Sequence, residues 1–293
     1  MRLGDEQESS NFEDRTGQRG FGFGGGGGGG LGLILGLVAS RFGIVGVLVL
    51  LVGYCALTQL GGGGGVVAPS GVQGGQPSGT STLDPNTKDI VLRVLGSTER
   101  RWTDIFAASG QRYEPTTLVF YTETNRSGCG IAQSTMGPFY CPTDKRIYLD
   151  TSFFNELRQR FGAPGDFAMA YVIAHEVGHH VQDLSGELGK TNAQQSHASE
   201  AEGNALQVRI ELQADCYAGV WARNDKNLLE PGDIEEGMTA ASAIGDDTLQ
   251  RETQGRVMPE SFTHGTSEQR VRWLRKGLET GDPAQCDTFS GPI

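Results

Sequence analysis

The residues that most constrain the fold are two histidines four positions apart, His175 and His179, with Glu176 directly after the first. On an α-helix this spacing places both imidazoles on one face, one turn apart, where they can hold one metal ion. Gly165-Asp166 predicts the start of this helix, and the apolar run 167–172 would bury it in a core. The sequence therefore predicts a buried helix that carries two metal ligands and a carboxylate.

The residue types at positions 175–179 favour zinc. Neutral imidazole is a good ligand for Zn²⁺, and a carboxylate beside a metal-bound water can take its proton. The order His-Glu-x-x-His is typical of zinc metallopeptidases. Because the whole chain has only five histidines, chance rarely produces this order. The alternative interpretation is a buried helix whose polar residues are incidental.

A second pair of spaced side chains offers a third ligand. Glu211 and Asp215 lie four positions apart in a segment with helical spacing, well after His179. One carboxylate can bind zinc while the other accepts the free ring N–H of a ligand histidine. We assign Glu211 to the metal and Asp215 to the ring of His175. The alternative is a solvated acidic face, but the small residues between 214 and 220 indicate close packing, where an unpaired Asp would be costly.

These two motifs resemble those of the gluzincins, in which two helices supply His, His and Glu to zinc. The stretch Glu211-Leu-Gln-Ala-Asp-Cys-Tyr-Ala-Gly-Val-Trp221, with Phe262-Thr-His-Gly-Thr-Ser-Glu-Gln-Arg270 downstream, more closely resembles the bacterial putative neutral zinc metallopeptidase family. Residues 1–4 and 10–15 are also similar to the start of that family, whose members are membrane-anchored. The resemblance implies a zincin-like fold, a Zn²⁺ cofactor and hydrolysis of peptide or protein substrates.

The resemblance also suggests roles for individual residues. Zn²⁺ would be held by His175, His179 and Glu211, and Glu176 would be the general base. Peptide hydrolysis further needs a group that stabilises the oxyanion. The family has a histidine with this role downstream of the third ligand, and His264 is the residue in that region. A structural turn is the alternative reading of His264.

Two other side chains have weaker assignments. Tyr217 is a second candidate for the oxyanion. Arg270 is expected to bind a carboxylate, near Asp215.

The N-terminal third of the chain differs in composition from the rest. Residues 1–30 are polar and then glycine-rich, which predicts disorder. Residues 31–60 predict one transmembrane helix, because positions 42–60 are long enough to span a bilayer and contain no charge. Residues 61–83, rich in Gly, Ser and Pro, predict a flexible linker, and 84–293 the metallopeptidase domain. A cleaved signal peptide is the alternative for the apolar run.

The distribution of positive charge predicts an orientation. Arginines 2, 15, 19 and 41 precede the apolar run, and no Lys or Arg follows it before Lys88. The N-terminus is therefore expected in the cytoplasm and the domain outside it, in the periplasm or extracellular space. The net charge of −11 and the lack of a basic patch argue against nucleic acid as a partner.

Four cysteines fall in the predicted domain, and three pairings of them are open. We favour Cys129–Cys141 and Cys216–Cys286, which agrees with an oxidising location. A zinc site built from cysteines is the alternative, and it is disfavoured because no C-x-x-C is present.

Hydrophobic periodicity predicts a mainly helical α+β domain. Helices are expected at 85–108, 151–161, 166–184, 199–223, 233–251 and 267–278, and strands at 117–122 and 145–150. Residues 185–197 are expected to form a loop. The stretch Arg146–Leu149 is a candidate to pair with an extended substrate, with an ordinary internal strand as the alternative.

Two other classes of function are compatible with these residues. One is a non-hydrolytic adaptor module in the cell envelope, stabilised by zinc. Glu176 argues against it, because a purely structural zinc site has no use for that carboxylate. The other is a small-molecule metallohydrolase on the same scaffold.

Overall fold

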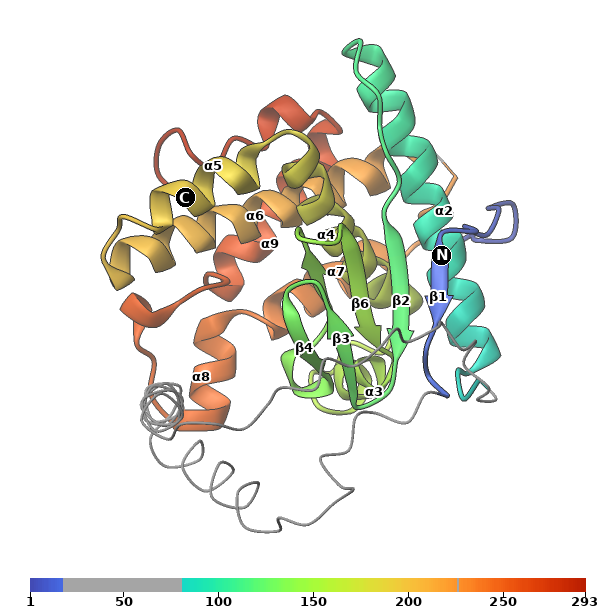
Figure 1. Cartoon of the computed structure of the whole chain (residues 1–293), viewed down its shortest axis with the longest axis horizontal. Helices are drawn as coiled ribbons and strands as arrows, with labels where there is room; N and C mark the ends of the chain where they lie inside the picture. Colours follow the sequence, from blue (N-terminus) through green and yellow to red (C-terminus); the bar gives the residue numbers. More distant parts are fainter. Residues whose placement is uncertain (18–80, 226) are drawn as a thin grey trace, which may run out of the picture. The chain divides into compact units, whose positions relative to one another are not determined.

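The computed structural model describes residues 1–17, 81–225 and 227–293. This part of the chain contains eight α-helices and two small sheets, so the mainly helical α+β class is confirmed. The helices are α2 (Pro85–Ala108), α3 (Ser152–Gln159), α4 (Asp166–Leu184), α5 (Glu187–Gln195), α6 (Glu200–Asn224), α7 (Asp233–Ala243), α8 (Asp246–Gln254) and α9 (Ser267–Thr280). Figure 1 shows α2 beside one edge of the sheet and α5, α6, α8 and α9 gathered on the opposite side.

The larger sheet has the strand order β1 (Phe12–Asp14), β2 (Thr117–Tyr121), β6 (Arg146–Asp150) and β5 (Phe139–Cys141). The first three strands are mutually parallel, and β5 is antiparallel to β6. In β2 the side chains of Leu118, Val119 and Phe120 are all fully buried, because both faces of this central strand are covered. Strands β3 (Thr124–Ser127) and β4 (Gly130–Gln133) form a separate antiparallel hairpin.

The prediction that Arg146–Leu149 pairs with a substrate is wrong. These residues belong to β6, which pairs with β2 on one side and with β5 on the other. Three of the four residues, Arg146–Tyr148, have strand neighbours on both sides and therefore no free backbone groups for a peptide. Among the described strands of this sheet, the free edges belong to β1 and β5.

Helices α4 and α6 pack against each other through small residues. A Cβ atom added at Gly178 of α4 would lie 3.0 Å from the Cα and carbonyl oxygen of Ala214 in α6. On its other side α6 meets α9 as closely, since a Cβ at Gly219 would lie 2.3 Å from the carbonyl oxygen of Leu274. The small residues noted in the sequence therefore allow α6 to lie between α4 and α9, with its acidic residues turned toward the histidines.

Three predicted boundaries differ from the structure. The region 233–251 forms two helices, interrupted where the extended backbone of Gly245 lies against Ser267. Residues 185–197 contain α5 rather than a loop. The N-cap of α9 is Thr266, one residue earlier than expected, and its hydroxyl accepts a hydrogen bond from the Gln269 N–H. The last difference depends on a local polar contact that hydrophobic periodicity does not detect.

The prediction that residues 1–30 are disordered is wrong for residues 1–17. Strand β1 pairs in parallel with β2, and the Ser9 N–H donates to the carbonyl of Leu92 in α2 at 2.9 Å. Met1, Leu3 and Phe12 pack against the core. Composition suggested disorder because apolar residues are sparse here, but backbone pairing with β2 replaces part of the apolar burial that the segment lacks.

The predicted linker is likewise ordered at its end. Ser81 donates to Asp14 at 2.5 Å, and Leu83 is buried. The remainder of the predicted N-terminal segment, the transmembrane helix 31–60 and linker residues 61–80 lie outside the described residues. Within the part that the structure describes, no helix is both long and apolar enough to cross a membrane.

Residues 1–17 and 81–293 form one compact unit. Two segments that pair in one sheet must lie on the same side of any membrane. The predicted arrangement, with the N-terminus in the cytoplasm and the domain outside it, is therefore incompatible with the position of β1.

Both favoured disulfides are confirmed. Cys129–Cys141 joins the β3–β4 turn to β5, with a Cα–Cα distance of 5.8 Å. Cys216–Cys286 joins α6 to the segment after α9, with a Cα–Cα distance of 5.6 Å. Cross-links of this kind typically stabilise a fold by about 2–4 kcal/mol.

Candidate metal centre

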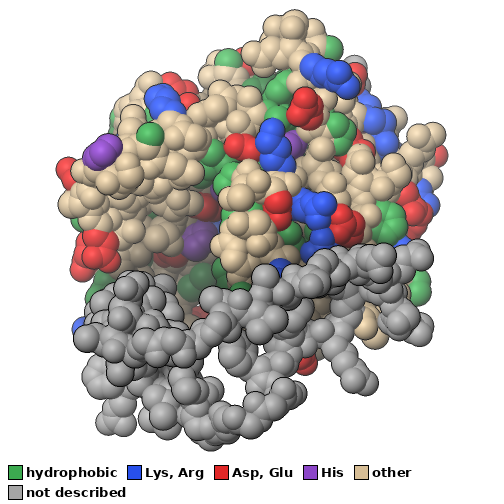
Figure 2. All heavy atoms as spheres, in the orientation of Figure 1, with side chains coloured by type: hydrophobic (Ala, Val, Ile, Leu, Met, Phe, Trp, Pro, Cys, Tyr) green, Lys and Arg blue, Asp and Glu red, His purple; other side chains and the backbone are tan. Residues whose placement is uncertain are grey.

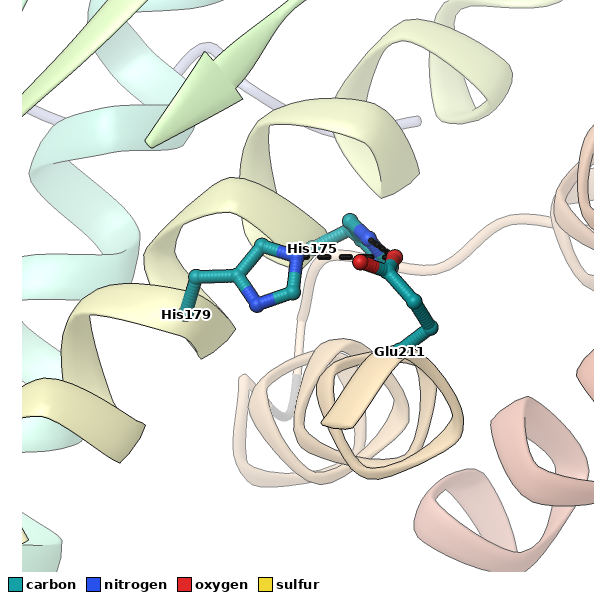
Figure 3. Close-up of side chains that lie close together, drawn as sticks. All are labelled: His175, His179 and Glu211. Atoms are coloured by element: carbon teal, nitrogen blue, oxygen red, sulfur yellow. Dashed lines mark hydrogen bonds and ion pairs between the residues drawn. The ribbon is translucent and has the colours of Figure 1, made fainter. Parts of the chain in front are cut away.

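The structure brings His175, His179 and Glu211 together from two helices. The two histidines project from α4 and Glu211 from α6, and one ligand atom from each lies within 4.8 Å of the others. Figure 3 shows the two rings and the carboxylate facing one another. Glu211 Oε2 lies 3.1 Å from His175 Nε2 and 3.6 Å from His179 Nε2. Two imidazoles and one carboxylate match the donors that Zn²⁺ takes in catalytic sites.

Contacts of the His175 ring indicate that a cation fits here. Its Nδ1 lies 2.8 Å from Asp215 Oδ1, while its Nε2 faces Glu211. A neutral imidazole has one N–H and can satisfy only one of these carboxylates. A metal ion between Nε2 and Glu211 removes this conflict, and Asp215 then accepts the remaining N–H. The position predicted for Asp215, on the His175 ring, is the one that the structure shows.

Glu176 lies in the wall of the same cleft, and its Oε2 is buried without a hydrogen-bond partner. An unpartnered buried carboxylate oxygen is rare, and it requires an explanation such as a bound water or ion. Burial raises the pKa of Glu176, although the neighbouring His179 and His175 oppose this. A carboxylate with a raised pKa is suited to take and return a proton near neutral pH.

The other ionisable groups of the centre are perturbed by one another. Burial lowers the pKa of His175, but Asp215 and Glu211 outweigh this effect and raise it to about 10. Burial raises the pKa of Glu211, but the charges of the facing histidines hold it well below its usual value. The centre without metal therefore keeps Glu211 ionised and binds protons where a cation would lie.

Asp215 connects three helices through a buried hydrogen-bond network. Arg270 of α9 donates from Nε to Asp215 Oδ2 and from Nη2 to Oδ1, both at 2.9 Å. The Tyr171 hydroxyl of α4 donates to Oδ1 at 2.6 Å. The carboxylate contact expected of Arg270 is thus with Asp215. Removing one partner of a buried ion pair of this kind typically costs about 3–5 kcal/mol. The role of Tyr171 was missed, although its position four residues before His175 was a usable signal.

His264 lies between α8 and α9 and lines the cleft together with Glu176 and Glu211. Its Nδ1 is 3.2 Å from Asp246 Oδ1, at the start of α8. Asp246 Oδ2 also accepts the backbone N–H groups of residues 263, 264 and 265 at 2.7, 2.6 and 3.1 Å. Burial lowers the pKa of His264, but Asp246 and Glu211 raise it overall. Sequence reasoning missed Asp246, because nothing in its local pattern connects it to a residue eighteen positions later.

Three further side chains lie outside the centre. Both ring nitrogens of His180 face other partners, the Tyr140 hydroxyl and the Glu114 carbonyl, so it does not join the ligand set. His197 is exposed. Tyr217, the second candidate for the oxyanion, instead packs edge-on against Trp102 in the core, with ring centroids 5.3 Å apart.

The centre opens into a cleft of about 650 Å³. Figure 2 shows a histidine in a recess beside the β3–β4 hairpin, on the face that carries this cleft. The segment 134–140 forms one wall, and apolar side chains line much of the remainder. These are Phe153, Phe161, Val172, Ile244 and Leu249. Such a cleft can hold a substrate larger than a single amino acid beside the metal ligands.

Two helices that present His, His and Glu beside a buried carboxylate and an open cleft define a candidate metal-dependent hydrolase. The chain belongs to the putative neutral zinc metallopeptidase family, whose model matches residues 1–289. It is 44% identical to the uncharacterized protein YpfJ of Escherichia coli strain K12 over 310 aligned residues, which cover all of both chains. It is 50% identical to the uncharacterized protein Rv2575 of Mycobacterium tuberculosis over 177 residues, 56% of this chain and 59% of that protein. No solved structure matches the chain.

Metal affinity of the chain is expected to depend on pH. In the metal-free chain the pKa of His175 is raised to about 10, so an entering ion must displace a proton at neutral pH. Affinity for Zn²⁺ should rise by at least about tenfold per pH unit from pH 6 towards 9. Competition with a chelator, corrected for the chelator's own protonation, measures this. Asp215→Asn removes the carboxylate that raises the pKa and should shift the dependence to lower pH. An affinity that is flat across this range would contradict the electrostatic account.

Proposed function

We propose that the protein hydrolyses peptide bonds as a zinc-dependent metallopeptidase. The observation that carries the proposal is the convergence of His175, His179 and Glu211 beside the unpartnered carboxylate of Glu176. Membership of a zinc metallopeptidase family supports it. The zincin-like fold inferred from the sequence is consistent with the two helices that supply the ligands, and it stays part of the proposal.

The proposed mechanism assigns one task to each side chain. Zn²⁺ bound by His175, His179 and Glu211 would lower the pKa of a water molecule and polarise the scissile carbonyl. Glu176 takes the proton of that water and delivers it to the leaving amine. Protonated His264 donates a hydrogen bond to the developing oxyanion. Asp215 holds the His175 ring in the tautomer that leaves Nε2 free for the metal.

An extended substrate is proposed to pair with the free edge of β5. Residues 134–140 run along the cleft into this strand, which pairs only with β6 among the described strands. Met136 in this segment lines the cleft and is 58% exposed, so a bound peptide can contact it. Backbone pairing of this kind would tolerate many side chains and favours peptides over small molecules.

The unit that holds the site is proposed to lie outside the cytoplasm. Two disulfides support this location, because such cross-links persist in oxidising compartments. Residues 1–17 would then lie outside as well, since they belong to the same unit. Membrane attachment through residues 31–60 is proposed from the sequence alone. Because residues 17 and 81 belong to one unit, this segment would have to enter and leave the bilayer on the same side, and it could not cross once as the single predicted helix does.

Glu176→Gln should keep one zinc per chain and lose hydrolysis. The amide preserves the shape of the side chain but cannot accept the proton of the attacking water. Metal analysis and cleavage of a casein-type substrate measure the two properties. Glu200→Gln, at the exposed start of α6, is the control and should retain both. Zinc without turnover in the wild type would favour the alternative of a zinc-stabilised adaptor. Turnover of small esters or amides, but not of peptides, would favour a small-molecule hydrolase.

His264→Ala should reduce kcat by about 10²-fold while the metal content is unchanged, because one hydrogen-bond donor to the oxyanion is lost. Asp246→Asn should have a smaller effect in the same direction, since Asp246 orients His264 without facing the metal ligands. Steady-state kinetics with metal analysis tests both, and His197→Ala on the exposed surface is the control. A wild-type kcat for His264→Ala would exclude His264 from the reaction.

Residues 10 and 194 should lie on the same side of the membrane. Both are exposed in the described unit, and Ser10→Cys or Gln194→Cys, each in a Cys55→Ala background, supplies one reactive thiol. A membrane-impermeant maleimide applied to spheroplasts should label both variants, and the Cys55→Ala parent should stay unlabelled. Labelling of Gln194→Cys alone would place the N-terminal segment in the cytoplasm. It would rule out β1 as part of the mature sheet.

A further inference from the structure

The two histidines of the candidate metal centre have different partners on their inner ring nitrogens. His175 Nδ1 faces the charged Asp215. His179 Nδ1 instead faces a neutral amide, the Oε1 of Gln182, at 2.9 Å. Gln182 lies on α4 three residues after His179, and its side chain is fully buried.

The amide of Gln182 continues into a second buried amide. Its Nε2 donates to the carbonyl of Ile210 at 2.8 Å and to Oε1 of Gln213 at 3.0 Å, both on α6. Gln213 Nε2 in turn donates to the backbone carbonyl of Cys286 at 3.1 Å. Cys286 is held by its disulfide to Cys216. A chain of hydrogen bonds therefore runs from the C-terminal segment to a ligand of the candidate metal centre.

The direction of every hydrogen bond in this chain is determined. A backbone carbonyl can only accept, so the Gln213 atom that faces Cys286 must be its NH₂ group. Its Oε1 then faces Gln182 and accepts. The same reasoning at the Ile210 carbonyl makes the Gln182 NH₂ group the donor, which leaves Gln182 Oε1 facing His179. His179 must therefore carry a proton on Nδ1, which leaves Nε2, on the side of Glu211, as the ring nitrogen that can bind a metal.

We propose that Gln182 and Gln213 are positioning residues that set the tautomer of His179, with the backbone carbonyls of Ile210 and Cys286 fixing how the two amides point. The Cys216–Cys286 disulfide thereby becomes a determinant of metal affinity, by holding that carbonyl in place. This inference rests on the proposed metal site, and it assigns two glutamines and a disulfide to the support of that site. Groups that hold the inner nitrogen of a ligand histidine typically change metal affinity by about 10–100-fold when they are removed.

The hydrogen-bonded amides of Gln182 and Gln213 form a relay without charge, and a neutral relay suits this position. The Gln182 side chain has no exposed surface, and the nitrogen and oxygen of both amides each have a hydrogen-bond partner in the relay. Asp215, by contrast, has the Arg270 guanidinium to balance its charge. A carboxylate at residue 182 would have the His179 N–H as donor but would face the Ile210 carbonyl and Gln213 Oε1 without a proton to donate. The relay thus fixes a tautomer without placing a second buried charge beside the centre.

The test compares two substitutions at one position. Gln182→Leu removes the acceptor for His179 Nδ1–H, and Gln182→Glu keeps an acceptor but removes both donors. Both variants should unfold at lower temperature than the wild type, because each removes the buried donor to Gln213 Oε1 and the second donor to the Ile210 carbonyl. Co²⁺ and Zn²⁺ affinities of the full chain are measured by chelator competition, with the visible spectrum of bound Co²⁺ as a report of geometry.

If the relay sets the tautomer, Gln182→Leu weakens metal binding by about 10–100-fold, while Gln182→Glu stays within a few-fold of the wild type. Gln213→Leu weakens binding in the same direction. The Gln182→Leu, Gln213→Leu double variant is no weaker than Gln182→Leu alone, because both act through one chain of bonds. If Gln182→Leu and Gln182→Glu lose metal affinity equally, in proportion to their fall in unfolding temperature, Gln182 has only a structural role. That result would overturn the proposal.

The disulfide is tested against the other disulfide of the chain. Replacing Cys216 and Cys286 by Ala should weaken metal binding in the wild-type background and add no further loss in a Gln213→Leu background. Replacing Cys129 and Cys141 by Ala is the control and should leave metal affinity unchanged. If the wild type does not bind metal, the proposed function itself is wrong. If the wild type binds metal and every variant binds it with the same affinity, only the positioning role of Gln182 and Gln213 is wrong.

Discussion

The structure around the candidate centre depends on the buried carboxylate of Asp215. It binds the His175 ring, the Tyr171 hydroxyl and the Arg270 guanidinium, and so joins α4, α6 and α9 at one point. Burial would raise the pKa of Asp215, but Arg270 and His175 hold it below the usual value. Asp215 therefore stays charged in the core, and its contact with Nδ1 holds the His175 ring in one orientation.

The two ligand histidines illustrate two ways to fix an imidazole. His175 depends on a charged partner balanced by arginine, whereas His179 depends on neutral amides that end at a backbone carbonyl. Both routes pass through α6, which also supplies Glu211. The close approach at Gly178 and Ala214 is what makes this possible, because longer side chains there would separate the helices.

The N-terminal segment shows how composition can mislead. Residues 1–17 contain few apolar side chains, yet they add a strand to the sheet and connect to α2. Their order comes from backbone hydrogen bonds to β2, a strand more than one hundred residues later in the chain. This pairing contradicts the expectation that the N-terminus and the domain lie on opposite sides of a membrane, because residues 1–17 and the domain form one unit.

The sequence by itself determined the helical spacing of His175 and His179, the second motif at Glu211 and Asp215, and most of the helix boundaries, while it favoured one cysteine pairing among three without deciding it. These features are local, or they follow from periodicity and from motifs whose chemistry requires fixed residue types. Only the tertiary structure decided that β6 is internal, that Asp246 holds His264, and that Gln182 and Gln213 connect His179 to Cys286. Each of these depends on contacts between segments far apart in the chain, and no periodicity within one segment records which distant partner satisfies a buried polar group.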